Sequence, residues 1–129
     1  MNDQFRSPGG APTTRPNPGA TLRPIGTGES FELVVNEPLK LGRGSDNPKI
    51  SRMLSPFTDV GREHALVILD NSGCVVVTDL DAANGTWVGG ERMTSRSSRT
   101  VRLPAKLRLG KECFLTLVEN PVGPVTDAS

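Results

Sequence analysis

The segment Ala65-Leu-Val-Ile-Leu69, the turn sequence Asp70-Asn-Ser-Gly73 and the segment Cys74-Val-Val-Val-Thr-Asp79 follow one another directly in the chain. The two apolar segments are short and rich in β-branched side chains, which is typical of β-strands. Asp, Asn and Ser bond the local backbone in a turn, and glycine adopts a positive φ at little cost. Residues 65–79 therefore predict a β-hairpin within an antiparallel sheet.

The rest of the chain between residues 29 and 119 repeats this pattern of short apolar runs and turn sequences, among them Asn84-Gly85 and Gly89-Gly90. Further strands are expected at residues 30–36, 39–42, 86–88, 100–103, 107–109 and 112–118. No long stretch has the apolar period of a helix, and only residues 50–55 could form a single helical turn before Pro56. The predicted fold class is an all-β, antiparallel β-sandwich.

Both ends of the chain have a different composition. Residues 1–28 are mainly Gly, Pro, Thr, Asn and Arg, which bury too little apolar surface to offset the entropy of ordering. We therefore predict a disordered N-terminal tail at 1–28, whose removal up to residue 25 should change the melting temperature little. Residues 120–129 contain two prolines and are expected to leave the sheet as a C-terminal tail. One domain is expected at 29–119.

The charge balance excludes several classes of function. With a net charge of +1, the chain has no large field of one sign that would attract nucleic acid or an anionic membrane. No apolar run is long enough for a membrane helix, and the first residues lack the pattern of a signal peptide, so we expect a cytoplasmic protein. A single histidine argues against a zinc site, and no cofactor is expected. Cys74 and Cys113 lie in apolar runs, as reduced thiols in strands do.

Two clusters of polar residues and glycines stand at the ends of expected strands. The first consists of Leu41-Gly42-Arg43 and Gly61-Arg62-Glu63-His64-Ala65, and the second is Asp79-Leu-Asp-Ala-Ala-Asn-Gly-Thr-Trp-Val-Gly-Gly90. Arg43 follows a strand directly, so its guanidinium can project into the loops and bind a phosphate with two parallel hydrogen bonds. A solvated loop arginine is the alternative.

In their order and spacing these clusters resemble the motifs of the forkhead-associated (FHA) domain family. The first is similar to Gly-Arg, a spacer and Ser-Arg-x-His-Ala, and the second to Asp-Leu-x-Ser-x-Asn-Gly-Thr-x-Val-Asn-Gly. The resemblance spans about residues 29–119. It implies two sheets packed face to face, with loops at one end that hold a phosphothreonine peptide.

The resemblance also implies roles for single residues. Binding of the phosphopeptide would fall to Arg43, Gly61, Arg62 and Asn84, with the Asn84 carboxamide bonding the main chain of the peptide. Gly42, His64, Gly85 and Thr86 would support the site, with His64 bonding the loops from beneath. Trp87 is interpreted as a packing residue.

The sequence departs from the family pattern at two serine positions, which are Gly61 and Ala82 here. Loss of a hydroxyl that bonds a charged acceptor costs about 1.5 to 3 kcal/mol, which corresponds to roughly ten- to a hundredfold weaker binding. The backbone N–H of Gly61 and the guanidinium of Arg62 could compensate. Other candidate donors stand in the long loop before Gly61, namely Ser51, Arg52, Ser55 and Thr58.

Two functions remain open. The first is a phosphothreonine-peptide adaptor in serine/threonine kinase signalling or complex assembly, and the second is a degenerate FHA domain that binds a protein partner without phosphate. No catalytic residue is expected, because His64 has no nucleophile at a related strand end and the glycine-rich segments lack the context of nucleotide loops. Thr13 or Thr14 could be phosphorylated and fold back onto the site, although Thr-Thr is also common in such tails.

Overall fold

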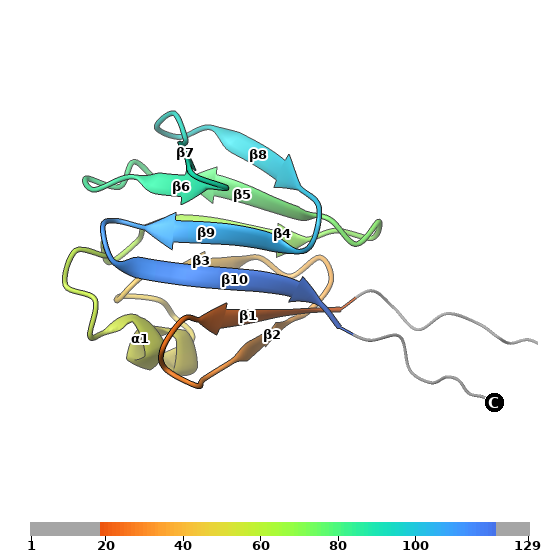
Figure 1. The fold of residues 1–129 in the computed structure, drawn as a ribbon, viewed down its shortest axis with the longest axis horizontal. Coiled ribbons are helices and arrows are strands. Elements are labelled where there is room, and N and C mark those ends of the chain that lie inside the picture. Colours follow the sequence, from red (N-terminus) through yellow and green to blue (C-terminus); the bar gives the residue numbers. More distant parts are fainter. Residues whose placement is uncertain (1–18, 121–129) are drawn as a thin grey trace, which may run out of the picture.

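The computed structural model describes residues 19–120, which form two antiparallel sheets packed face to face and one short helix (Figure 1). The predicted all-β sandwich is confirmed. The elements in chain order are β1 (Ala20–Pro24), β2 (Phe31–Leu33), β3 (Leu39–Leu41), α1 (Pro48–Leu54), β4 (Ala65–Leu69), β5 (Val75–Asp79), β6 (Thr86–Val88), β7 (Glu91–Arg92), β8 (Ser98–Val101), β9 (Ala105–Leu109) and β10 (Cys113–Glu119). The helix is far too short to cross a membrane, and the described part of the chain has no other.

The strand order is β2-β1-β10-β9-β6-β7 in the six-stranded sheet and β3-β4-β5-β8 in the four-stranded sheet. The hairpin at 65–79 is confirmed as β4–β5, with Ala65 opposite Asp79 and Leu69 opposite Val75. In its turn, Asp70 accepts hydrogen bonds from the backbone N–H groups of Ser72 and Cys74. A further bond from the Ser72 hydroxyl holds the pKa of the Asp70 carboxyl below its usual value. Local polar groups therefore close this turn.

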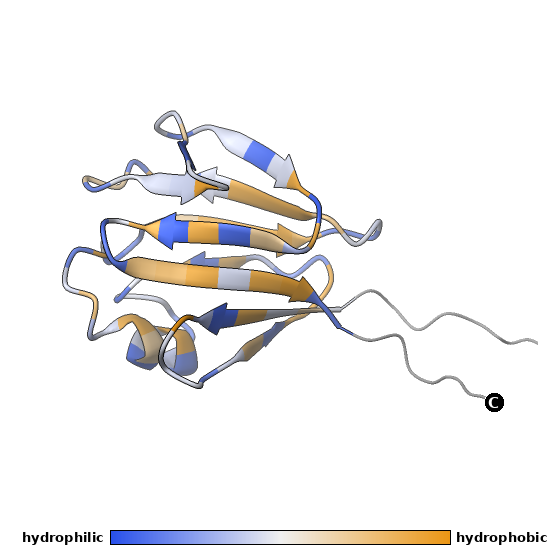
Figure 2. Cartoon of the chain, viewed as in Figure 1, coloured by the Kyte–Doolittle hydropathy of each residue, from blue (hydrophilic) through white to orange (hydrophobic). Residues whose placement is uncertain are grey.

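The core lies between the two sheets, because alternate residues of each strand point inward. The burial pattern of β4 and β5 follows this period of two. Apolar residues concentrate along β10 and the β4–β5 hairpin, whereas the turns are mostly hydrophilic (Figure 2). Leu115 and Leu117 of β10 are fully buried, as is Leu22 of β1. Each such leucine contributes about 1.5 to 3 kcal/mol by leaving water.

The predicted N-terminal boundary is wrong for the described part of residues 1–28. Ala20–Pro24 forms β1, which lies between β2 and β10 and pairs along its whole length with the end of β10. Ala20 and Leu22 are fully buried. The physical reason is that β1 obtains its hydrogen-bond partners from the far end of the chain, so its own composition does not reveal it. Residues 1–18 and 121–129 lie outside the described residues, and with them the rest of both predicted tails and Thr13 and Thr14.

Some smaller boundaries also differ. The expected single turn at 50–55 is part of α1, which begins after Asn47 because the Asn47 side chain accepts hydrogen bonds from the N–H groups of Lys49 and Ile50. The strand expected at 100–103 is β8 at Ser98–Val101, where Ser98 bonds Thr78 across the sheet. The turn sequence Gly89-Gly90 closes the hairpin of β6 and the two-residue strand β7, with Val88 opposite Glu91.

Candidate functional site

The loops that carry the two polar clusters meet at one end of the sandwich, opposite the end where β1 begins and β10 ends (Figure 1). These loops join β3 to α1, α1 to β4, and β5 to β6. The β9–β10 turn lies at the same end. The fold thus brings together residues that are up to about seventy positions apart in the sequence, as loops at one end of a β-sandwich do.

Two backbone hydrogen bonds join the segment after β3 to the segment before β4. The N–H of Arg43 donates to the carbonyl of Gly61 at 3.0 Å, and the N–H of Gly44 donates to the carbonyl of Arg62 at 2.9 Å. Gly42 directly precedes these two donor residues, and a Cβ on it would stand 2.1 Å from the Arg62 carbonyl oxygen. Only glycine permits this approach, so the Gly-Arg sequence has a steric cause.

Arg43 is exposed and held in place at its base. Its Nε donates to the carbonyl of Val60 at 2.6 Å, and its own carbonyl accepts from the Ser51 hydroxyl at 2.7 Å. Among residues 19–120, neither terminal nitrogen of the guanidinium has a hydrogen-bond partner. A positioned guanidinium with two free nitrogens can bind one anion through two hydrogen bonds.

His64 is fully buried and connects two of the loops. Its Nδ1 accepts from the N–H of Gly61 at 2.9 Å, and its Nε2 lies 2.7 Å from the carbonyl oxygen of Gly85. These partners fix the neutral tautomer with the proton on Nε2. Both ring nitrogens are therefore occupied, and His64 holds the Gly61 loop against the Asn84-Gly85 turn.

We expect His64→Ala to lower the free energy of unfolding by about 2 to 4 kcal/mol, because it leaves the Gly61 N–H unpaired, removes one of the two hydrogen bonds to the Gly85 carbonyl and opens a cavity in the interior. Urea denaturation followed by circular dichroism measures this loss. Lys40→Ala is the matched control, since Lys40 only forms an exposed ion pair with Glu63 and should change stability by less than about 0.5 kcal/mol. Equal midpoints for the two variants would contradict the supporting role of His64.

Asn84 lies in the exposed turn between β5 and β6. Gly85 closes this turn with φ +85°, and its N–H donates to the carbonyl of Ala82 at 3.2 Å. The Asn84 side-chain N–H2 donates to the carbonyl of Asp59 at 2.9 Å, which leaves the carboxamide oxygen available as an acceptor. Thr86, which follows, is buried and donates to the Asp79 carboxylate at 2.5 Å. The turn is thus anchored on both sides.

Asp59 is a residue of this end that the sequence motifs do not contain. Besides its carbonyl contact to Asn84, its carboxylate accepts the N–H of Lys111 from the β9–β10 turn. The charge of Asp59 also acts on Cys113, a free and buried cysteine. Burial raises the pKa of the Cys113 thiol to about 12, and the charge of Asp59 adds to the shift. Through its two hydrogen bonds, Asp59 links the loop before β4 to the β5–β6 turn and the β9–β10 turn.

The proposed compensation for the missing serine at position 61 is partly contradicted. The N–H of Gly61 already donates to His64, so it is not available to a phosphate. The hydroxyls of Ser51 and Ser55 donate to the carbonyls of Arg43 and Arg52. These three donors already have hydrogen-bond acceptors within the chain.

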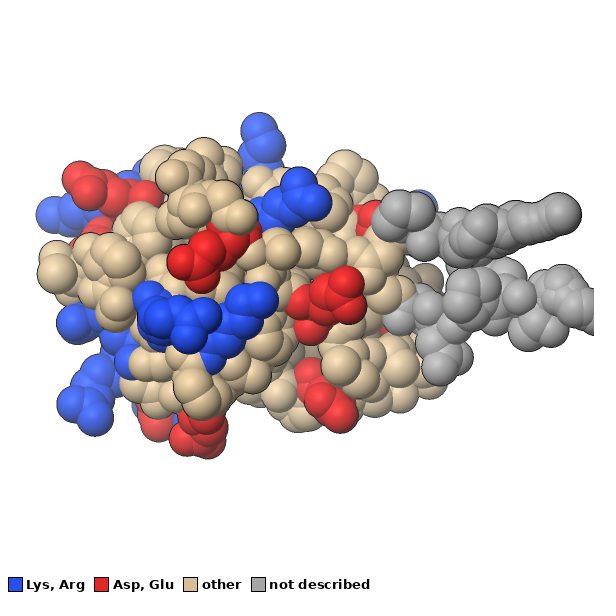
Figure 3. Space-filling view, turned by 90° about the horizontal axis from the view of Figure 1, so that it is seen from below, with Lys and Arg blue, Asp and Glu red and all other residues tan. Residues whose placement is uncertain are grey.

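Arg52, Arg62 and Thr58 remain as donors, and the exposed Arg52 guanidinium has no hydrogen-bond partner in the described part of the chain. Arg62 is exposed, and its side chain runs over Gly44, since its Nε lies 3.5 Å from where a Cβ on Gly44 would stand. Thr58 is exposed, and its hydroxyl has no hydrogen-bond partner among residues 19–120. On the face shown in Figure 3, Lys and Arg side chains lie mainly on the half nearer to the loop end. The loop end therefore has cations available in addition to Arg43.

A family model described as FHA domain matches residues 39–110, which is more than half of the chain and contains every residue of both clusters. Solved structures with the same fold include the FHA domain of the CT664 protein from Chlamydia trachomatis, which is 21% identical, with a TM-score of 0.64, over 84% of this chain and 100% of that one. The Mycobacterium tuberculosis Rv1747 FHA-1 domain is 17% identical, with a TM-score of 0.61, over 82% and 100%.

The N-terminal FHA domain of Rad53p from S. cerevisiae, solved in complex with a phosphothreonine peptide, is 18% identical, with a TM-score of 0.60, over 78% of this chain and 90% of that one. No curated protein sequence matches the chain. These solved structures have the same fold as this chain, which agrees with the match of the family model. On that match, with the loop geometry described above, the chain belongs to the FHA domain family.

Proposed function

We propose that this chain binds phosphothreonine-containing segments of partner proteins at the loop end, as an adaptor in serine/threonine kinase signalling. The observation that carries the proposal is the geometry of Arg43, whose guanidinium is fixed through Nε to Val60 and keeps two nitrogens free toward solvent. FHA domains are phosphothreonine-peptide binding modules, and the yeast relative was solved with such a peptide.

Each part of the ligand has a partner of suitable chemistry. The phosphate dianion would accept two hydrogen bonds from Arg43 and further charge from the neighbouring Arg62. The peptide backbone would donate an N–H to the free carboxamide oxygen of Asn84. Because Asn84 is itself held by Asp59, the phosphate and the backbone contacts have a fixed separation. Such preorganisation lowers the entropy lost on binding.

Binding, not catalysis, is the chemistry that this site supports. Both ring nitrogens of His64 are bonded to the backbone, so the imidazole cannot take a proton from a substrate without breaking a loop contact. The cytoplasm, where serine/threonine kinases would modify the partner, is the proposed location. Phosphate-independent binding is the second candidate function, since Gly61 and Ala82 supply no hydroxyl to the site.

Calorimetric titration with matched phosphothreonine, phosphoserine and unmodified peptides from an oriented library tests the proposal. We expect binding of phosphothreonine peptides only, and a loss of about ten- to a hundredfold in Arg43→Ala. Lys49→Ala, on the exposed side of α1, is a charge-matched control that should bind as the wild type does. Equal binding of phosphorylated and unmodified peptides would favour the phosphate-independent function.

Gly61→Ser should strengthen binding by about 1 to 2 kcal/mol, that is, roughly five- to thirtyfold, because it adds a hydroxyl donor beside Arg43. The structure has room for it, since a Cβ on Gly61 would meet no atom closer than 3.6 Å. Arg43→Ala in the Gly61→Ser background should remove the gain, and calorimetry on the four proteins of this cycle separates the two contributions. If the wild type already binds as tightly as Gly61→Ser, then Arg62 or Thr58 supplies the missing donor.

A further inference from the structure

A second surface lies on the outer face of the six-stranded sheet, where it begins beside the β9–β10 turn and continues along β9 away from the loop end. The strand registers place Phe114 of β10 opposite Arg108 of β9, Arg108 opposite Trp87 of β6, and Trp87 opposite Arg92 of β7. Their neighbours along the strands, such as Leu115 and Leu109, point into the core, so these four side chains point outward. Aromatic and cationic side chains therefore alternate across four adjacent strands.

The members of this row contact one another. The guanidinium carbon of Arg108 lies 4.1 Å from the centroid of the Trp87 ring and 5.8 Å from that of Phe114, and that of Arg92 lies 5.9 Å from Trp87. These distances fall within the range of cation–π interactions. We call the row, together with Lys106, the aromatic-cation face. Stacking between rings holds the Arg108 side chain in one orientation.

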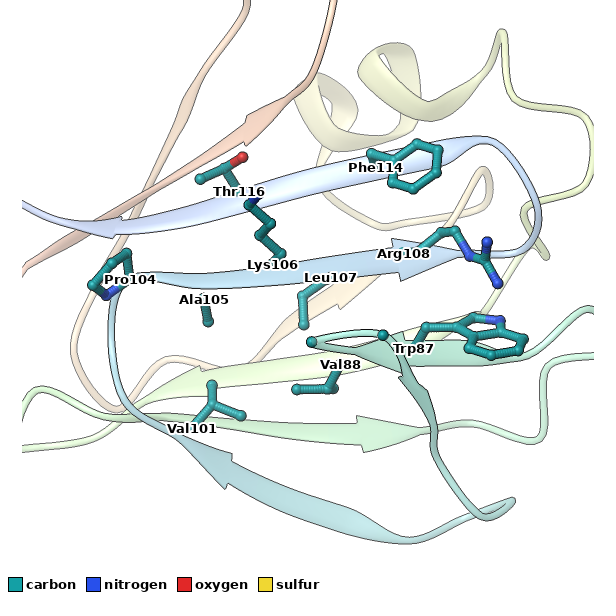
Figure 4. Close-up of a pocket in the computed structure, with 12 residues that line it drawn as sticks. Trp87, Val88, Val101, Pro104, Ala105, Lys106, Leu107, Arg108, Phe114 and Thr116 are labelled. Atoms are coloured by element: carbon teal, nitrogen blue, oxygen red, sulfur yellow. The ribbon is translucent and has the colours of Figure 1, made fainter.

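A groove of about 700 Å³ opens beside this row and follows β9 (Figure 4). Its apolar residues include Val88, Leu107 and Val101, the last of which comes from β8 in the other sheet. Lys106, Arg108 and the ring of Phe114, which is 46% exposed, line it as well. Within residues 19–120, no Asp or Glu contributes to its lining. The groove thus combines an apolar interior with a cationic rim.

Two donors of this face lack acceptors. Trp87 Nε1 and Arg108 Nε are buried and have no hydrogen-bond partner among the described residues. Such donors are normally satisfied in folded proteins, and an unsatisfied one is costly. They are adjacent to the groove, so a ligand that brings acceptor oxygens to this face could satisfy them. An exposed phenylalanine beside them is a second feature that a ligand would cover.

We propose that the aromatic-cation face binds an extended acidic segment of a partner protein, which places one apolar side chain in the groove and its carboxylates against Lys106 and Arg108. The cationic rim favours an acidic segment through charge complementarity. The apolar interior of the groove favours one apolar side chain, because such pockets bind apolar side chains of a partner. A second copy of the chain would bring like charges together. A single-stranded nucleic acid needs free ring faces, whereas Arg108 already covers the Trp87 ring.

Trp87 is the only tryptophan of the chain, so its fluorescence reports binding at this face directly. The probe is a set of peptides Glu-Glu-Φ-Glu-Glu in which Φ is Leu, Ile, Met or Phe, with Gln-for-Glu peptides as controls. We expect a saturable change in emission with at least one acidic peptide and none with the Gln peptides. Affinity should fall about tenfold between about 50 and about 300 mM NaCl, since the contacts are exposed charge pairs.

Lys106→Glu should weaken binding about tenfold or more through charge reversal, whereas Lys49→Glu, on the exposed side of α1, should leave it unchanged. Arg43→Ala should bind the acidic peptide normally, which separates this surface from the phosphothreonine site. The proposal is overturned if no acidic peptide binds, if Gln peptides bind equally, or if Lys49→Glu weakens binding as much as Lys106→Glu. Tighter binding of oligo(dT), or self-association that changes Trp87 emission without peptide, would assign the face to another occupant.

Discussion

A chain that lacks residues 1–25 will fail to unfold cooperatively. A chain that begins at Gly19 will have the same melting temperature as the full-length protein. The longer deletion removes β1, which lies between β2 and β10 in the six-stranded sheet. It exposes the edge of β10, detaches β2 and removes the fully buried Leu22. The lost burial and strand pairing amount to about 5 kcal/mol or more, comparable with the whole stability of a small domain.

Thermal melts followed by far-UV circular dichroism distinguish the two deletions. Two point variants of the same strand separate burial from chain length. Leu22→Ala should cost about 3 kcal/mol because it leaves a cavity, and Arg23→Ala, whose side chain is exposed, should cost less than about 0.5 kcal/mol. A melting temperature of the 1–25 deletion within about 5 °C of the full chain would contradict the structural role of β1.

This prediction reverses the one made from composition, and the reason is physical. The hairpin at 65–79 is determined by neighbours in the sequence, so alternation and turn residues suffice to predict it. The strand β1 pairs with Leu115 and Leu117, which are its neighbours in space but lie at the opposite end of the domain in the sequence. Its flanking Pro and Gly residues dominate the local composition. Pairing over such a distance leaves no periodic signal in a segment of five residues.

The same distinction applies to the site, where some features could be predicted from the sequence and others could not. The placement of Arg43, His64 and Asn84 at one end of the sandwich could be predicted, because side-chain chemistry at strand ends is visible in sequence and resembles a known motif. The contributions of Val60 and Asp59 could not, because they act largely through backbone carbonyls, which every residue has. The same holds for the N–H of Gly61, whose engagement with His64 excludes it as a phosphate donor.

Gly42→Ala should be among the most damaging single changes at the site, because the space that a Cβ needs is filled by backbone. The new atom would stand 2.1 Å from the carbonyl oxygen and 2.7 Å from the carbonyl carbon of Arg62. Relief requires the strand end to move away, which breaks the bonds from Arg43 to Gly61 and from Gly44 to Arg62. We expect a loss of about 3 kcal/mol in the free energy of unfolding.

The same movement displaces the base of Arg43, so phosphothreonine-peptide binding should fall at least about tenfold even where the protein is still folded, since misplacement of a charged contact costs upward of 1.4 kcal/mol. Gly61→Ala is the matched control, because its Cβ would make only an ordinary contact of 3.6 Å with His64. Urea denaturation and calorimetry on both variants measure the two effects. If Gly42→Ala and Gly61→Ala have equal denaturation midpoints, the close approach at Gly42 is not what positions Arg43, and the support of the guanidinium rests on Val60 and Ser51 alone.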